Sequence, residues 1–180
     1  MPNHWFTGDT HFGNQRTLEL SRRPFSTVKE MDAEIVRNWN QVVQPDDIVF
    51  HIGDFGNYEI SHQLNGEIHL ILGNYERNDI EKGIVSLDDL TSKFNFKSVD
   101  EEQRVSLSFN NELIQLVHEP TNRNMAFFTL FGHIHKLQMV KQNALNVGVD
   151  CHQFTPIDLE TVLFYKNAIQ NHYDKDVFSF

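Results

Sequence analysis

Residues 48–54 have the sequence IVFHIGD, in which a short apolar run ends at Gly53 and Asp54. An apolar run of this length that is followed by a turn residue is typical of a buried strand. The same arrangement occurs at residues 4–9, HWFTGD, and at residues 68–74, IHLILGN. The sequence therefore predicts buried strands at 4–7, 48–52 and 68–72, each followed by a tight turn that presents a polar side chain.

A helix is predicted between the first two of these strands. Residues 27–43 carry Met31, Ile35, Trp39, Val42 and Val43 at helical spacing. Thr27 and Glu30 match a capping box at its start, and Pro45 stops it. A short helical segment separates the second strand from the third. This order favours an α/β sheet with parallel neighbours and right-handed crossovers.

The second half of the chain has a different pattern, made of short strands. They are predicted at 96–99, 104–109, 113–117, 127–131, 137–140 and 145–147. Asn110 and Asn111 suit a hairpin turn, since Asn tolerates positive φ. A last helix is expected at about 159–168, with Asp158 as its cap. The predicted fold class is α/β (α+β): a two-layer β-sandwich flanked by helices, in a single domain over residues 1–180.

Composition restricts the possible partners. The 180 residues are 39% hydrophobic and 22% charged, which is typical of a soluble globular domain. The formal net charge of -10 opposes strong binding to nucleic acid or to an anionic membrane, because both depend on clustered Lys and Arg. A small phosphorylated or nucleotide-type substrate stays compatible, since bound divalent cations can invert the local field.

Cysteine content and hydropathy bear on the compartment. Cys151 is the only cysteine, so no intramolecular disulfide can form. The first residues lack a signal-like apolar segment, and no apolar stretch approaches the ~20 residues needed to cross a bilayer. We expect a cytoplasmic protein that is not inserted in a membrane.

Side chains able to bind metal ions follow the predicted strands or lie beside glycine. They are Asp9, His11, Asp54, Asn74, His118, His133 and His135. Ligands bind at the carboxyl ends of the strands in an α/β sheet, so these residues are expected to converge. Imidazole mixed with carboxylate and amide oxygen suits Mn, Fe, Zn or Ni. Seven ligands exceed one tetrahedral zinc but suit two ions that share a carboxylate, for which Asp54 is the natural bridge.

Five blocks of the sequence resemble the calcineurin-like metallophosphoesterases, in the order found in that family. These are Asp9-Thr10-His11, Gly53-Asp54, Gly73-Asn74-Tyr75-Glu76, His118 and Gly132-His133-Ile134-His135. Flanking segments also resemble small bacterial and phage members, notably residues 5–9, 23–25, 38–40 and 146–150. Any one block alone is a weak signal, whereas all five in order are a strong one.

The resemblance implies a fold, a metal centre and an activity. Asp9, His11, Asp54 and His135 would hold one metal ion, and Asp54, Asn74, His118 and His133 would hold the other. Mn²⁺ is expected first, and Fe, Zn, Ni or Mg are alternatives. The implied activity is hydrolysis of a phosphoester, in particular a phosphodiester or nucleotide, by a metal-bound hydroxide. Asn74, Tyr75 and Asp54 are the catalytic residues of this hypothesis.

Tyr75 is a departure from the family, because histidine normally follows the asparagine of the third block. That imidazole helps to protonate the leaving oxygen, and a free phenol, with a reference pKa of ~10, matches this task less well. Good leaving groups would then be favoured: aryl esters, phosphoanhydrides or strained cyclic diesters. The alternative is a catalytically weakened scaffold or binding protein that keeps the fold.

Candidates for binding the rest of the substrate are Arg77, Arg123 and Asn14. Arg77 follows the third block directly, and a guanidinium can bind phosphate through two hydrogen bonds. Asn14 replaces a histidine that close relatives often carry. Arg16, Arg22 and Arg23 are interpreted as surface charges, and Cys151 as incidental to the site. His51, His62, His69 and His172 are interpreted as strand or surface residues, whereas His152 could approach the metal centre.

Overall fold

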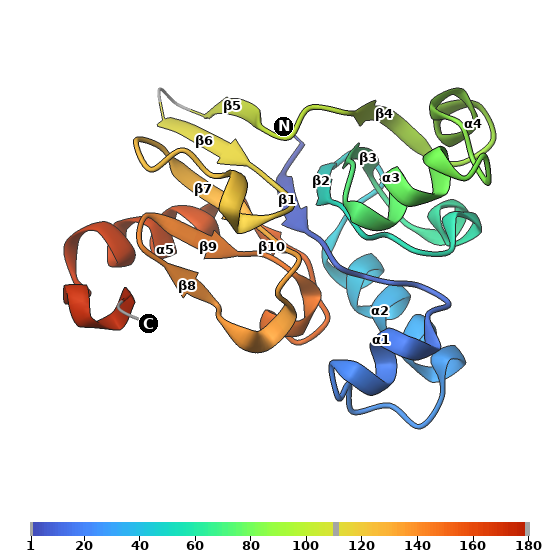
Figure 1. The fold of residues 1–180 in the computed structure, drawn as a ribbon, viewed down its shortest axis with the longest axis horizontal. Coiled ribbons are helices and arrows are strands. Elements are labelled where there is room, and N and C mark those ends of the chain that lie inside the picture. Colours follow the sequence, from blue (N-terminus) through green and yellow to red (C-terminus); the bar gives the residue numbers. More distant parts are fainter. Residues whose placement is uncertain (1, 110–111, 179–180) are drawn as a thin grey trace.

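Two five-stranded sheets organise the residues that the computed structural model describes, 2–109 and 112–178 (Figure 1). The first sheet has the order β10-β1-β2-β3-β4 and the second has the order β5-β6-β7-β9-β8. The first contains β1 (His4–Thr7), β2 (Ile48–Ile52), β3 (Glu67–Ile71), β4 (Phe96–Asp100) and β10 (Ile157–Asp158). The second contains β5 (Val105–Phe109), β6 (Glu112–Leu116), β7 (Phe128–Phe131), β8 (Val140–Lys141) and β9 (Ala144–Asn146).

The parallel direction of the strands brings several of their carboxyl ends to one edge of the sheet. β1, β2, β3 and β4 are parallel, so their carboxyl ends lie together. In the second sheet β6, β7 and β9 are also parallel to one another. A parallel bridge between Gly8 and Gly148 joins the ends of β1 and β9, and thus links the two sheets at this edge.

Successive side chains along the strands of the first sheet point to opposite faces. The sheet therefore contributes to two hydrophobic cores. Val49 and Leu70 face helix α2 (Val28–Val42), in a cluster with Trp39. Ile52 and Ile71 face the second sheet, in a cluster with side chains such as Leu116 and Leu130. Both faces are covered at the central strand β2, whose sequence IVFHI is almost entirely apolar, as expected for a buried parallel strand. The edge strand β4, FKSVD, is partly exposed.

Helices cover the outer faces of both sheets. In Figure 1, α2, α3 and α4 lie beside the first sheet and α5 lies beside the second. The helices are α1 (Gln15–Leu20), α2 (Val28–Val42), α3 (Asn74–Glu81), α4 (Leu87–Ser92) and α5 (Leu159–Asn171). This arrangement confirms the predicted two-layer β-sandwich flanked by helices. None of the helices among the described residues combines the length and apolar character needed to cross a bilayer.

Helix caps follow the sequence prediction closely. The Thr27 hydroxyl accepts a hydrogen bond from the Glu30 amide, and Asp158 accepts one from the Thr161 amide. The Glu30 carboxylate binds the Ser26 amide instead of closing the capping box on Thr27.

Residues 137–140 are not a strand, contrary to the prediction. His135–Leu137 forms a 3₁₀ turn, η3, and only Val140–Lys141 pairs with β9. Apolar residues alone do not make this segment a strand; a strand forms only where the backbone pairs with β9. The short helices α1, α3 and α4 and strand β10 were not predicted, and the predicted turn at residues 110–111 lies outside the described residues.

Candidate metal centre

The candidate ligands converge at the shared edge of the two sheets. Asp9, Asp54 and Asn74 follow β1, β2 and β3, while His118 follows β6 and His133 follows β7. Their ligand atoms form two groups in which all atoms lie within 4.8 Å of one another: Asp9, His11 and Asp54, and Asp54, His118 and His133. Asp54 belongs to both groups, which is the arrangement expected of a bridging carboxylate.

Several of these residues have an unfavourable backbone conformation. Asp9, His11, Asp54, His133 and His135 have φ values of 54°, 50°, 57°, 70° and 49°. The left-handed region costs a non-glycine residue about 1–3 kcal/mol and is found most often at functional sites. All five residues lie in the turns that follow β1, β2 and β7, so the strained conformations coincide with candidate ligands.

The Asp9 carboxylate is fixed between main-chain groups. It is fully buried, and both of its oxygens accept from the His133 amide, at 2.9 and 2.8 Å. Gly132 and Gly148 border it so closely that a Cβ atom at either position would lie 2.7 or 2.5 Å from Asp9 Oδ2. Burial raises the pKa of Asp9, and a positive charge nearby would oppose this shift.

Asp54 lies between two imidazoles. Its Oδ2 atom is 3.5 Å from His11 Nε2 and 3.5 Å from His118 Nε2. Two ligand atoms that each lie ~2.1 Å from one cation at a tetrahedral angle are about 3.4 Å apart. Each of the two distances therefore suits a metal ion that is bound by Asp54 and by that histidine. The other oxygen of Asp54 accepts from the Tyr75 amide at 2.9 Å, which fixes the carboxylate plane.

His11 provides a direct test of whether the residues suit a cation. Its side chain is buried, yet neither ring nitrogen has a hydrogen-bond partner among the described residues. Burial lowers the pKa of His11 to about 3, so the ring is neutral and one nitrogen carries a free lone pair. A buried polar atom without a partner is costly, and a metal ion would satisfy it.

His118, Asn74 and His133 form the other group. His118 Nδ1 donates to the Ile52 carbonyl at 2.8 Å, while Nε2 lies 2.9 Å from Asn74 Oδ1. His133 Nδ1 lies 3.0 Å from the same Asn74 oxygen. Burial alone would lower the pKa of His118, but the carboxylates of Asp54 and Asp9 outweigh it and raise the pKa to about 9. This group therefore favours a bound positive charge.

Glu76 is not a candidate ligand, but its carboxylate binds the main chain beside two of the ligands, Asp54 and Asn74. Its buried carboxylate accepts from the amides of Asp54, Phe55 and Gly73, at 2.8, 2.7 and 2.8 Å. It thus joins the turn after β2 to the turn after β3. Glu76 belongs to the third of the five blocks, but this role was not predicted from the sequence.

Arg23 and Asp150 form a buried ion pair behind His135. Arg23 donates to Asp150 through Nε and Nη2, at 3.0 and 2.8 Å, and also to the carbonyl oxygens of Asp9 and Thr10. Asp150 in turn contacts His135 Nδ1 at 2.7 Å, which leaves Nε2 of His135 free for a metal. The interpretation of Arg23 as a surface charge is therefore wrong, because its side chain is buried beside the candidate ligands.

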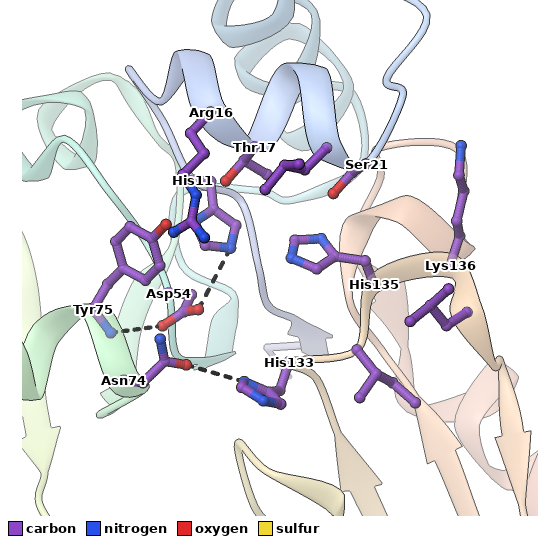
Figure 2. Close-up of a pocket in the computed structure, with 13 residues that line it drawn as sticks. His11, Arg16, Thr17, Ser21, Asp54, Asn74, Tyr75, His133, His135 and Lys136 are labelled. Carbon is purple, nitrogen blue, oxygen red and sulfur yellow. Dashed lines mark hydrogen bonds and ion pairs between the residues drawn. The ribbon is translucent and has the colours of Figure 1, made fainter.

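A cleft of about 430 Å³ opens directly on the centre (Figure 2). One wall consists of candidate ligands, among them His11, Asp54 and His133, together with Tyr75. The opposite wall comes from α1 and the turn around η3. In Figure 2 the Tyr75 ring stands at the side of His11, and their ring centroids are 4.7 Å apart.

The predicted substrate residues have different surroundings. Arg77 lines a separate cavity of about 70 Å³ that also touches Asn74 and His118, and its guanidinium donates to the Glu101 carbonyl. Arg123 donates to the Pro120 carbonyl, outside the cleft. The Asn14 side chain caps α1 by accepting from the Thr17 amide. Arg16 is exposed, in agreement with its interpretation as a surface charge, and it also lines the cleft.

Two further residues lie near the centre without joining the ligand groups. His152 is held by the Asn146 carbonyl, at 2.7 Å from its Nε2 atom. Cys151 contacts the His135 carbonyl at 3.3 Å. Burial, with Asp150 and Asp9 nearby, raises the pKa of the Cys151 thiol to about 12, so it stays protonated at neutral pH.

Two curated proteins are similar to the chain in sequence. An uncharacterized protein of Methanocaldococcus jannaschii is 28% identical over 181 residues, covering 91% of this chain and 90% of that protein. The Gene 66 protein of Mycobacterium phage L5 is 35% identical over 85 residues, covering 42% of this chain and 41% of that protein. No protein-family model matches the sequence.

One solved structure shares the fold, and a second gives a lower similarity. A protein of unknown function from Aquifex aeolicus superposes with a TM-score of 0.71 at 17% identity, covering 92% of this chain and all of that one. A structure described as a novel archaeal phosphodiesterase gives a TM-score of 0.47 at 19% identity, covering 88% of this chain and 94% of the other. The first likeness shows a common fold, and function must be argued from the site itself.

Proposed function

We propose that this protein is a metal-dependent phosphoesterase that uses two divalent cations to hydrolyse a phosphodiester or nucleotide-type substrate. The observation that carries the proposal is the pair of ligand groups that share Asp54. Asp9, His11, Asp54 and His135 would hold one cation, and Asp54, Asn74, His118 and His133 the other. Mn²⁺ is the first candidate, since mixed nitrogen and oxygen ligands suit borderline and hard cations.

When bound, such cations would activate water and neutralise charge on the phosphoryl oxygens. The protein's own contribution is preorganisation. Main-chain groups fix Asp9 and Asp54, while Asp150 orients the His135 ring through its Nδ1 atom. Outer contacts of this kind typically change metal affinity or activity by about 10- to 100-fold.

Tyr75 stands in the cleft beside His11 and is the residue proposed to contact the leaving group. Its hydroxyl can donate a hydrogen bond to the leaving oxygen but is a weaker acid than an imidazolium. The proposed enzyme therefore prefers esters with good leaving groups, such as aryl phosphodiesters.

A binding protein that keeps the fold is the second candidate, and Tyr75 is the feature that favours it. The intact ligand set opposes it, because buried polar groups such as Asp9 and His11 are costly when nothing satisfies them. The test is to assay the Mn²⁺-loaded protein on bis(p-nitrophenyl) phosphate beside Asp54→Ala. Turnover that disappears in Asp54→Ala supports the enzyme, whereas equal rates in both proteins contradict it.

A further inference from the structure

The cleft beside the metal centre has a charge that differs from that of the whole chain. Arg16 and Lys136 line it, and among its described lining residues the only carboxylate is the candidate ligand Asp54. The complete chain has a formal net charge of -10. Figure 2 shows the Arg16 side chain reaching from α1 into the space beside Tyr75 and above Asp54. A guanidinium in this place can bind the oxygens of a phosphoryl group held at the centre.

The outer part of the same cleft is apolar. Leu20 of α1 and Leu137 of η3 both line it, and they are 70% and 87% exposed. Ile134 adds a further aliphatic side chain to this wall. Two such exposed leucines beside one pocket are a site where a ligand gains by covering apolar surface.

The side chains that line the cleft suit some classes of ligand better than others. Apart from the candidate metal ligands Asp54 and Asn74, the described lining residues include no carboxylate or carboxamide side chain. These are the groups that read the hydrogen-bonding edges of adenine and cytosine in proteins. The outer cleft therefore suits an apolar group better than adenine or cytosine.

We propose that the substrate is a phosphate ester with an apolar aryl or alkyl group, which lies between Leu20 and Leu137 while Arg16 binds the phosphoryl oxygens. This inference rests on the proposed phosphoesterase function and names its substrate class. The volume of about 430 Å³ accommodates a phosphoryl group with one aromatic ring.

The test measures binding, so that it does not depend on turnover. Phenylphosphonate and methylphosphonate, neither of which is an ester, are titrated into the Mn²⁺-loaded protein by calorimetry. Phenylphosphonate is expected to bind roughly tenfold more tightly, the ratio given by about 60 Å² of covered apolar surface. Leu20→Ser and Leu137→Ser should each reduce this preference, and Arg16→Gln should weaken both ligands by a similar factor.

Ile84→Ser is the matched control, because Ile84 is 67% exposed and does not line the cleft. Equal affinities for the two phosphonates overturn the inference, as does a preference that survives both leucine substitutions. A nucleoside monophosphate that competes better than phenylphosphonate and ignores Leu20→Ser also overturns it. If bis(p-nitrophenyl) phosphate is still hydrolysed in an Asp54-dependent way in any of these cases, the proposed function stands and only the substrate class is wrong.

Discussion

Arg23 and Asp150 are 127 residues apart in the chain and form a two-point ion pair whose side chains are almost completely buried. The pair joins two parts of the candidate metal centre. Arg23 also donates to the main chain at Asp9 and Thr10, and Asp150 also contacts His135. Burial alone would raise the pKa of Asp150, but His135 and Arg23 outweigh it and hold the pKa at about 2.

Breaking this pair is predicted to cost both stability and metal affinity. Removing one partner leaves a buried charge uncompensated, so Arg23→Met should lower the free energy of unfolding by about 3–5 kcal/mol. Asp150→Asn should weaken Mn²⁺ binding by about 10- to 100-fold, because His135 loses the carboxylate that orients it. Urea titration and equilibrium dialysis measure the two effects.

The control for this prediction is the surface pair of Glu34 and Arg37, whose side chains are 31% and 61% exposed. Glu34→Gln should change stability by less than about 0.5 kcal/mol and leave Mn²⁺ affinity unaltered. Losses of equal size in Glu34→Gln and Arg23→Met would contradict the role assigned to the buried pair.

Gly148→Ala is predicted to disturb the metal centre through a steric contact alone. The backbone at Gly148 has φ -57°, which alanine adopts freely, but the new Cβ atom would lie 2.5 Å from Asp9 Oδ2. Asp9 must then move, and Mn²⁺ affinity should fall by at least about tenfold.

Gly83→Ala is the control for Gly148→Ala, because it strains the backbone without a steric contact. Gly83 has φ +68°, and a Cβ atom added there would meet no described atom within 4 Å. Alanine at this position therefore strains the backbone by about 1–2 kcal/mol without reaching the centre. Its stability should fall while Mn²⁺ affinity stays at the wild-type value. Unchanged Mn²⁺ affinity in Gly148→Ala would show that the position of Asp9 is not critical.

Tyr75→His is predicted to change the dependence of rate on the leaving group. An imidazole near the reacting phosphate is a better general acid, and such catalysis is typically worth about 10²- to 10⁴-fold for poor leaving groups. Turnover on alkyl phosphodiesters should therefore rise more than turnover on nitrophenyl esters. A series of esters with graded leaving-group pKa measures the slope, and an identical slope in both proteins would refute this account of Tyr75.

Asp47 gives a pH dependence that is independent of the metal centre. Burial alone would raise the pKa of Asp47, but the amides of Gln44 and Asn3 and the Trp5 indole donate to its carboxylate and lower the pKa. Because the folded-state pKa is the lower one, the unfolded state binds more protons in this range. The stabilisation is complete above the unfolded value of ~3.9 and is lost as the pH falls through the folded value.

Asp47→Asn should therefore be less stable than wild type at neutral pH, and the difference should shrink below about pH 4. Urea midpoints measured at several pH values check this. A difference that stays constant from pH 7 to pH 3 would contradict the assigned hydrogen bonds.

The positions of β1, β2 and β3 could be predicted from the sequence because each is a short, largely apolar run that ends near a glycine. The predicted strand at 48–52 coincides with β2, since its apolar run ends sharply at Gly53. Helix α1 was missed because six residues span fewer than two turns, too few for a periodic pattern. Residues 137–140 were mistaken for a strand because apolar content alone does not reveal pairing partners.

The candidate ligands were predicted from their places after strands, and the structure brings them together. The Arg23–Asp150 pair was not predicted, because an isolated arginine looks the same in a sequence whether it is buried or exposed. The available signal was that the segments 23–25 and 146–150 both resembled the family outside its metal-binding blocks. Arg16 is exposed, as interpreted from the sequence, but its place beside the cleft depends on helix α1, which was not predicted.

Asp54 is proposed to join two cation sites in one chain. Equilibrium dialysis against saturating Mn²⁺, followed by elemental analysis of the protein, measures the number of bound ions directly. We expect two Mn²⁺ ions per wild-type chain and fewer than two for Asp54→Ala, with Ile84→Ser equal to wild type. A wild-type protein that binds one ion or none at saturation would contradict this proposal.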